Sequence, residues 1–249
     1  MLANPTLERL HQLGLLGMAK AFADLQDTTQ AADLSFEDRL GLMLDREADL
    51  RETRRYQTRL RQAKLRLQAA IEDIDFRTPR GLDKALVLRL ADCQWITATQ
   101  NLLIIGPTGA GKTWLACALG HQACRNNLSV LYLRLPRLIE DLALARADGR
   151  YPKLLRSLAR VKLLILDDWG MAPLTAEARR DLLEIADDRH GIAATLITSQ
   201  FPLDTWHELI GDPTLADAIL DRIIHNAHRI QLKGESMRKK KRRAHTEDA

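Results

Sequence analysis

The sequence predicts an α/β fold with a mainly parallel, five-stranded sheet, preceded by a small N-terminal helical domain. Three observations lead to this prediction. From about residue 83 onward, short apolar runs alternate with segments of helical periodicity. The first apolar run leads directly into a glycine-rich turn, and the third ends in two acidic residues. The residues before 78 carry helical signals alone.

Residues 1–78 are expected to form the helical domain. Asn4-Pro5 is typical of a helix start, because proline is favoured in the first turn. A second, long helix is expected to begin at the capping signal in residues 35–38. Residues at helical spacing predict one apolar face along it, formed by Tyr56, Leu60, Ala63, Leu67, Ile71 and Ile74. The helix is therefore expected to continue to Ile74.

Residues 79–236 are expected to form the α/β domain, and residues 237–249 a basic tail. Strands are predicted near residues 102–105, 129–133, 163–167, 194–198 and 228–232. Helices are predicted near residues 112–126, 136–147, 175–189, 203–210 and 214–224. Because helices separate successive strands, the sheet should be mainly parallel and should bind its ligand at its carboxyl edge.

A glycine-rich segment, residues 106–113, follows the apolar run Leu102–Ile105. A buried strand that passes through such a turn into a helix is the context of a phosphate-binding loop, so we expect ATP as the ligand. Lys112 should reach the β- and γ-phosphates, and the Thr113 hydroxyl should bind Mg²⁺. The whole loop supplies candidate nucleotide-binding residues, namely Gly106, Pro107, Thr108, Gly109, Ala110, Gly111, Lys112 and Thr113.

Two carboxylates directly follow the four apolar residues Leu163–Leu166 and should reach the same edge of the sheet. Asp167 is expected to hold the water shell of Mg²⁺, and Asp168 to orient or deprotonate the attacking water. Many ATPases of this kind carry glutamate at the second position, and aspartate is one methylene shorter. We therefore expect slow or partner-stimulated hydrolysis. The alternative is a pair of solvated acids after a core strand.

Polar residues also end the predicted strand at 194–198. Gln200 is the preferred candidate for contacting the γ-phosphate or positioning water, with Thr198 and Ser199 as the next candidates. The alternative is a strand that simply reaches solvent there.

Two arginines further along the chain are candidates for sensing ATP. Arg222 ends an apolar helix and could reach the γ-phosphate of a neighbouring subunit as a trans finger. An intramolecular ion pair with Asp217 or Asp221 is the alternative, because these acids lie close to it in sequence. Arg238 could be a second sensing arginine that contributes to nucleotide binding.

Positive charge is concentrated in two segments. The net charge is +4, and residues 237–249, with six basic and two acidic residues, account for all of it. The segment 51–66 holds seven cations against one acid. The candidate DNA-binding residues are Arg51, Arg54, Arg55, Arg59, Arg61, Lys64, Arg66, Lys239, Lys240 and Lys241. Neither segment contains a base-recognition motif. We therefore expect largely sequence-independent binding to the backbone of double-stranded DNA. A solvated helix face and a solvated tail are the alternatives.

Other features limit the class of protein. No apolar run approaches the ~20 residues of a membrane span, and the first residues lack a signal-peptide pattern. The three cysteines lack metal-binding spacing, so reduced, packed thiols are expected. These features predict a cytoplasmic location.

Taken together, the motifs resemble those of the IstB transposition helper ATPases, and more broadly the AAA+ branch that these share with DnaC-type helicase loaders. The resembling segments span nearly the full length and are residues 106–113, 163–168, 198–200, 220–222, 226–230 and 234–238. The resemblance implies a P-loop AAA+ core without a C-terminal helical lid, and it favours Arg222 as a finger. It further implies an ATP-dependent homo-oligomer that assembles on DNA and assists a transposase.

Three other functions stay open at this point. A DnaC-like replicative helicase loader would have the same motifs but a helicase as its partner. A small-molecule phosphotransferase would carry an arginine-rich lid in place of a trans arginine and a cationic tail. A nucleotide-gated DNA clamp with negligible turnover would be compatible with an aspartate at position 168.

Overall fold

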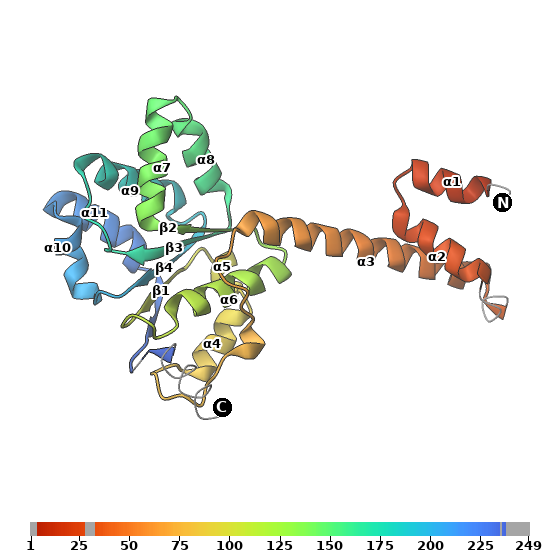
Figure 1. Cartoon of the computed structure of the whole chain (residues 1–249), viewed down its shortest axis with the longest axis horizontal. Coiled ribbons are helices and arrows are strands. Elements are labelled where there is room, and N and C mark those ends of the chain that lie inside the picture. Colours follow the sequence, from red (N-terminus) through yellow and green to blue (C-terminus); the bar gives the residue numbers. More distant parts are fainter. Residues whose placement is uncertain (1–3, 28–32, 235, 238–249) are drawn as a thin grey trace, which may run out of the picture. The chain divides into compact units, whose positions relative to one another are not determined.

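The computed structural model describes residues 4–27, 33–234 and 236–237 (Figure 1). The chain divides into two compact units, one that runs through Thr58 and one that starts at Arg59. This division comes earlier in the chain than residue 78. The functional division into residues 1–78, 79–236 and 237–249 stays a prediction.

The first unit consists of α1 (Pro5–Gln12), α2 (Leu16–Asp27) and the first part of α3 (Phe36–Ala63). Gly17 allows α2 to approach α3 closely, because a Cβ there would lie 2.6 Å from the carbonyl oxygen of Arg46. The Glu47 carboxylate of α3 accepts hydrogen bonds from the N–H groups of Gly17 and Met18, at 2.6 and 3.2 Å. These bonds satisfy two of the free N–H groups at the start of α2.

The prediction that the long helix continues to Ile74 was wrong. Helix α3 ends at Ala63, and Lys64 has a left-handed backbone with φ of +51°. The chain then forms an irregular segment that includes the short 3₁₀ helix η2 (Ile71–Asp73). Ala69 and Ile74 are buried, and η2 packs against a helix of the second unit. The apolar residues after position 64 therefore serve tertiary packing rather than one continuous helix face.

The second unit is built on a parallel sheet of five strands. They are β1 (Asn101–Ile105), β2 (Val130–Arg134), β3 (Leu163–Trp169), β4 (Ala194–Ser199) and β5 (Ala227–Gln231). Their order is β2-β3-β4-β1-β5, and every neighbouring pair is parallel. The predicted α/β class and five-stranded parallel sheet are thus confirmed.

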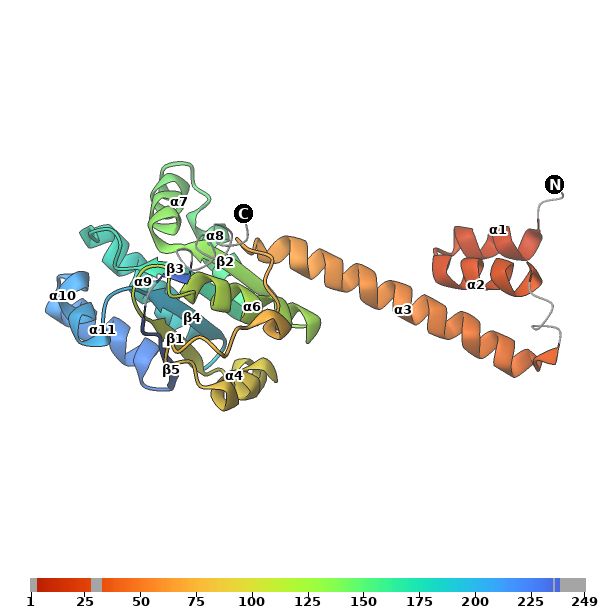
Figure 2. The ribbon, with the colours of Figure 1, turned by 60° about the horizontal axis from the view of Figure 1, so that its bottom comes forward.

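Helices cover both faces of this sheet (Figures 1 and 2). They are α4 (Lys84–Ala91), α5 (Gln94–Thr97), α6 (Lys112–Arg125), α7 (Leu135–Ala147), α8 (Tyr151–Arg160), α9 (Ala176–Arg189), α10 (Trp206–Ile210) and α11 (Pro213–Ile224). The 3₁₀ helix η3 (Leu203–Thr205) precedes α10. The sequence analysis did not predict α4, α5 or α8. In the part of the chain described, no helix has the length and apolarity needed to cross a membrane.

Side chains of each strand alternate between the two faces of the sheet. Leu103, Leu164 and Ile197 join a buried core with side chains from α7 to α11. Helix α6 lies on the opposite face, where it contacts β1 to β4. Gly120 of α6 permits this close packing, because a Cβ there would lie 2.8 Å from Cδ1 of Ile165. The start of α6 is thereby held at the carboxyl edge of the central strands.

Candidate nucleotide site

The predicted phosphate-binding loop connects β1 to α6, as expected. Gly106 cannot be replaced without movement, because a Cβ there would lie 2.5 Å from the carbonyl oxygen of Leu232. Gly111 has φ of +98°, in the left-handed region that glycine tolerates best. Helix α6 begins directly after it, at Lys112. The loop therefore directs the N-terminus of α6 toward the edge of the sheet where an anion would bind.

Lys112 folds back over the loop. Its Nζ donates hydrogen bonds to the carbonyl oxygens of Gly106 and Pro107, at 2.8 and 3.0 Å. Burial lowers the pKa of Lys112, while the negative charges of Asp167 and Asp168 oppose this effect. A partly desolvated ammonium with neutral hydrogen-bond partners is well suited to bind a phosphate.

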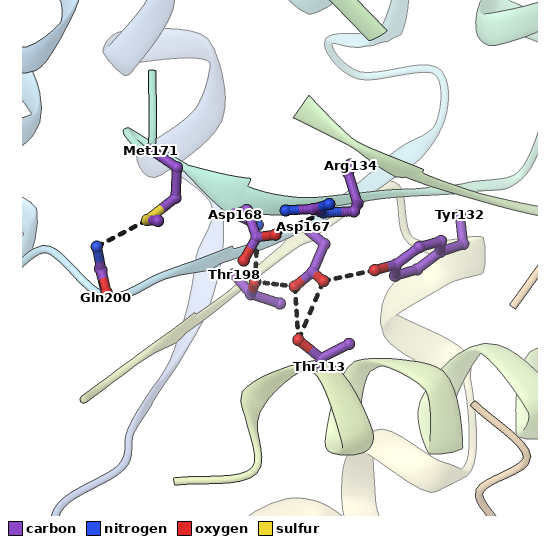
Figure 3. A network of polar contacts seen from close by, with 8 residues as sticks. All are labelled: Thr113, Tyr132, Arg134, Asp167, Asp168, Met171, Thr198 and Gln200. Carbon is purple, nitrogen blue, oxygen red and sulfur yellow. Dashed lines mark hydrogen bonds and ion pairs between the residues drawn. The ribbon is translucent and has the colours of Figure 1, made fainter. Parts of the chain in front are cut away.

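Asp167 is fully buried near the end of β3 and accepts hydrogen bonds from three hydroxyl groups (Figure 3). Thr113 lies 3.0 Å from both carboxylate oxygens, and Tyr132 and Thr198 complete the set. Burial and the neighbouring Asp167 raise the pKa of the Tyr132 phenol, so it remains a donor. The structure thus brings together the two residues that were predicted to hold Mg²⁺.

These oxygen groups fit a magnesium ion that also binds phosphate oxygens and water. Mg²⁺ prefers hard oxygen ligands and is commonly held by one or two protein groups together with substrate phosphates. Within the described residues, no group of three or more histidines, cysteines or acids could hold a metal by itself. The Thr113 hydroxyl and the Asp167 carboxylate would therefore share the ion with the nucleotide.

Asp168 has a left-handed backbone with φ of +65° and forms an ion pair with Arg134 (Figure 3). The distance from Nε of Arg134 to Oδ2 of Asp168 is 2.8 Å. Arg134 is the last residue of β2, and the neighbouring carboxylate raises its pKa. The sequence analysis did not predict this partner, although β2 was expected to end at this edge. Asp168 is consequently held by a cation in the arrangement seen here.

Gln200 lies just beyond β4 and contacts the phosphate-binding loop. Its side-chain oxygen accepts a hydrogen bond of 2.8 Å from Thr108, and its amide nitrogen lies 2.7 Å from the sulfur of Met171. Of the two other candidates, Thr198 is bonded to Asp167, whereas Ser199 donates to the carbonyl of Trp169 at 3.1 Å. Gln200 therefore has the position expected for its proposed role, which itself stays a prediction.

These groups surround a cavity of about 690 Å³. Cavities of a few hundred to about 1,000 Å³ are typical of small-molecule and cofactor sites. Lys112, Thr113, Asp168, Arg134 and Gln200 line it on the side of the sheet edge. The segment between α3 and α4 contributes to the lining as well, and its lining residues are Arg66, Leu67, Gln68, Asp73, Asp75 and Arg80. No local motif in the sequence had indicated this contribution.

A family model described as IstB-like ATP binding protein matches residues 8–245 of the chain. The chain belongs to this family. An insertion sequence ATP-binding protein of Sinorhizobium fredii is 58% identical over 243 residues, which cover 98% of this chain and 99% of that protein. The predicted family is therefore confirmed, and the chain is an ATP-binding P-loop ATPase.

Solved structures show that the fold is shared more widely. The crystal structure of DnaI is similar with a TM-score of 0.58 at 22% identity, over 71% of this chain and 93% of that chain. The structure of AMPPCP-bound DnaA from Aquifex aeolicus gives a TM-score of 0.59 at 15% identity, over 75% of this chain and 57% of that chain. Both likenesses confirm the predicted fold of the nucleotide-binding core.

In this IstB-like chain, Arg222 lies at the end of α11 and forms an ion pair with Asp187 of α9. Its Nη1 also donates to the carbonyl of Ala218 at 2.8 Å. The partner is thus neither Asp217 nor Asp221. Arg222 is not among the described residues that line the nucleotide cavity. A contact with ATP in trans stays a prediction, and Arg238 lies outside the described residues.

The basic segment 51–66 is divided among several environments. Arg51 pairs with Glu47 at 2.7 Å, and this contact lowers the pKa of Glu47. Arg59 donates to the carbonyl of Cys124 at 3.1 Å and to Oδ1 of Asn127 at 2.6 Å. Lys64 and Arg66 lie past the end of α3, and Arg66 lines the nucleotide cavity.

The other exposed arginines of this segment on α3 are Arg54, Arg55 and Arg61. Lys239, Lys240 and Lys241 lie outside the described residues. Binding of DNA by any residue of the segment or the tail stays a prediction.

Proposed function

We propose that this chain is an ATP-dependent DNA-binding regulator that self-assembles on double-stranded DNA and assists a transposase in target selection and transposition. The main support is its similarity, over nearly the full length of both chains, to an ATP-binding protein of an insertion sequence. The candidate nucleotide site adds support, with Lys112, Thr113, Asp167 and Asp168 at one edge of the sheet. The functional partner would be the transposase of the same insertion sequence.

The geometry supports a slow, stimulated hydrolysis step. Lys112 would exchange its two carbonyl partners for phosphate oxygens, while Thr113 and Asp167 hold Mg²⁺, which would neutralise phosphate charge. Oδ2 of Asp168 can act on a water only after it leaves Arg134. A step that separates this ion pair, such as binding of a neighbouring subunit or of DNA, would therefore stimulate turnover.

Two basic helix faces could contact DNA phosphates. Arg54, Arg55 and Arg61 are exposed on α3. Helix α8, which the sequence analysis missed, exposes Lys153, Arg156 and Arg160. Their spacing of three and four residues puts these three cations on one face, and no acid occurs in α8 to offset them. A uniform row of cations favours phosphate contacts over base recognition.

DNA binding should therefore depend steeply on salt. Replacing Lys153, Arg156 and Arg160 of α8 by glutamine should weaken binding to unrelated duplexes equally. It should also flatten the plot of log K against log salt by roughly 0.9 per lost phosphate contact. The same experiment applies to Arg54, Arg55 and Arg61, and to Lys239, Lys240 and Lys241. Arg137→Gln is the matched control, because this cation is already paired with Glu140 and Asp141.

Fluorescence anisotropy with labelled duplexes, measured with ATP present, gives these slopes. If all three sets of cations can be neutralised without a change in affinity or slope, DNA binding through these faces is ruled out. A change confined to one set would identify the face that carries the contact.

Transposition is the direct test of the proposed function. With the insertion sequence on a donor plasmid, omission of this protein or its replacement by Lys112→Ala should sharply reduce insertions into a target plasmid, while transposase levels stay constant. Equal insertion frequencies with and without the protein would contradict the proposal. In the alternative function, a DnaC-like loader, the protein would co-purify with a replicative helicase rather than with the transposase.

A further inference from the structure

Arg80 is a buried cation directly beside the phosphate-binding loop. The residue is 6% exposed, and its guanidinium lines the nucleotide cavity. Nη1 donates to the carbonyl of Ala110 and Nη2 to the carbonyl of Asp75, both at 3.2 Å. Nε is buried without a hydrogen-bond partner among the described residues. The backbone is fixed as well, because the carbonyl of Arg80 accepts a 2.8 Å hydrogen bond from the N–H of Lys233.

This arrangement leaves the charge of Arg80 uncompensated at close range. Its bonded partners are neutral carbonyls, and burial lowers its pKa, an effect that the more distant Asp75 carboxylate opposes. That carboxylate is itself engaged by the N–H of Arg77 and the hydroxyl of Thr78, at 2.8 and 2.6 Å. Buried charges are normally paired, so an unpaired cation in a cavity wall indicates an anionic ligand.

The loop residue that Arg80 contacts indicates which part of the nucleotide it would face. Lys112 bonds the carbonyls of Gly106 and Pro107, at the start of the loop. Arg80 bonds the carbonyl of Ala110, at the end of the loop, and its Nη1 lies 2.7 Å from where a Cβ on Gly111 would be. The two cations thus flank opposite ends of the loop, and Lys112 is the one that reaches the β- and γ-phosphates.

The segment that carries Arg80 contributes other residues to the cavity lining. Leu67, Gln68 and Asp73, from the same segment of the chain, line the cavity with it. A nucleotide whose terminal phosphates lie against Lys112 and Thr113 would extend its ribose and base toward this segment. The phosphate between the terminal phosphates and the ribose is the α-phosphate.

We infer that Arg80 is a nucleotide-binding residue that contacts the α-phosphate of ATP and ADP. This inference rests on the ATP binding of the family and is independent of DNA binding and transposition. The hydrogen bonds to the carbonyls of Ala110 and Asp75 hold the guanidinium in the cavity lining, where it can bind an anionic ligand.

The direct test is calorimetric titration of the full chain with ADP and with ATP. Arg80→Met keeps the length of the side chain but removes its charge. It should weaken both nucleotides by the same factor, about 10- to 100-fold, as expected for loss of a hydrogen bond between charged groups. Arg80→Lys should regain part of this loss. Arg77→Met, an exposed arginine in the same segment, is the matched control and should bind as the wild type.

The nucleotide affinity of the folded variant separates binding from a purely structural role. If Arg80 only ties the segment to the loop, Arg80→Met should melt at a lower temperature and bind nucleotide normally once folded. If Arg80 is a binding residue, folded Arg80→Met should bind both nucleotides more weakly, whatever its melting temperature, because the variant loses the cation in the cavity lining. Wild-type affinity in folded Arg80→Met, or a loss confined to ATP, would overturn the inference.

An ADP analogue with one sulfur in place of a non-bridging α-phosphate oxygen gives a second measurement. In the wild type this analogue should bind more weakly than ADP, and the ratio of the two affinities should shrink in Arg80→Met. An unchanged ratio would refute a contact with the α-phosphate. If Arg80→Met does not fold, the same ratio measured for Arg80→Lys decides. Wild-type ADP binding serves as the control that the nucleotide site itself is intact.

Discussion

Lys112→Ala is expected to abolish detectable ATP binding. In the nucleotide-free arrangement the ammonium is partly buried and bonded only to the carbonyls of Gly106 and Pro107. Removing the cation that faces the β- and γ-phosphates should cost about 3–5 kcal/mol of binding free energy, which is at least a hundredfold in affinity. Calorimetric titration with ATP measures this loss directly.

The free energy of unfolding should hardly change in Lys112→Ala. Burial disfavours the ammonium form of Lys112, so its removal does not take away a stabilising ion pair. Lys153→Ala is the matched control, since this lysine is exposed on α8 and outside the cavity lining. ATP affinity at the wild-type level in a folded Lys112→Ala protein would contradict the role assigned to Lys112.

Asp168→Asn should block the hydrolysis of ATP, whereas Lys112→Ala should block the earlier step, ATP binding. The asparagine has the same shape and leaves Lys112, Thr113 and Asp167 in place, so ATP should still bind. Turnover should fall by roughly 10²–10⁴, the usual contribution of a general base. Phosphate release under saturating ATP measures this effect, and wild-type rates would remove Asp168 from the mechanism. The two variants together separate the binding of ATP from its hydrolysis.

The parts of the site that the sequence predicted correctly depend on local signals. The loop at residues 106–113 directly follows the buried strand β1, and the acids after Leu166 lie in the last part of β3. In a parallel sheet all carboxyl ends meet at one edge, so local strand prediction was enough to bring Thr113 and Asp167 together. The helix α6 begins where the motif requires, at Lys112.

The parts that the sequence did not predict depend on long-range packing. Arg134 and Asp168 are separated by 34 residues, and no motif marks a lone arginine at the end of β2. Arg80 acquires its position through contacts with Ala110 and Lys233. The end of α3 at Ala63 was missed for a related reason, because apolar residues at helical spacing can equally pack an irregular segment onto another helix. Periodicity alone does not distinguish these outcomes.

Arg222→Ala is expected to bind ATP but to hydrolyse it poorly. Arg222 pairs with Asp187 and lies outside the described lining of the cavity in its own subunit. We therefore expect it to contact the γ-phosphate of ATP bound to a neighbouring subunit. Such a finger contributes roughly 10³–10⁵ in rate in other ATPases and GTPases. Wild-type activity should then rise more than linearly with protein concentration, and ATP and DNA should both favour the assembled state.

Asp187→Asn distinguishes a finger role of Arg222 from a purely structural role. The ion pair is partly exposed, with side-chain exposures of 31% and 47%, so its loss should cost at most about 1 kcal/mol of stability. If Arg222 acts only through this pair, Asp187→Asn and Arg222→Ala should have equal effects on activity. If Arg222 is a finger, Asp187→Asn keeps the arginine and should retain turnover, whereas Arg222→Ala should lose it.

Mixed assemblies decide whether the finger acts in trans. Lys112→Ala subunits lack a nucleotide site but keep Arg222, whereas Arg222→Ala subunits keep the site and lack the finger. In a mixture, some interfaces join an intact site to an intact finger, so part of the ATPase activity should return although each variant alone is inactive. Light scattering or sedimentation must show that the two variants co-assemble. If they do and the mixture stays inactive, Arg222 is a structural ion-pair residue, and the cation that reaches the γ-phosphate must come from elsewhere in the chain.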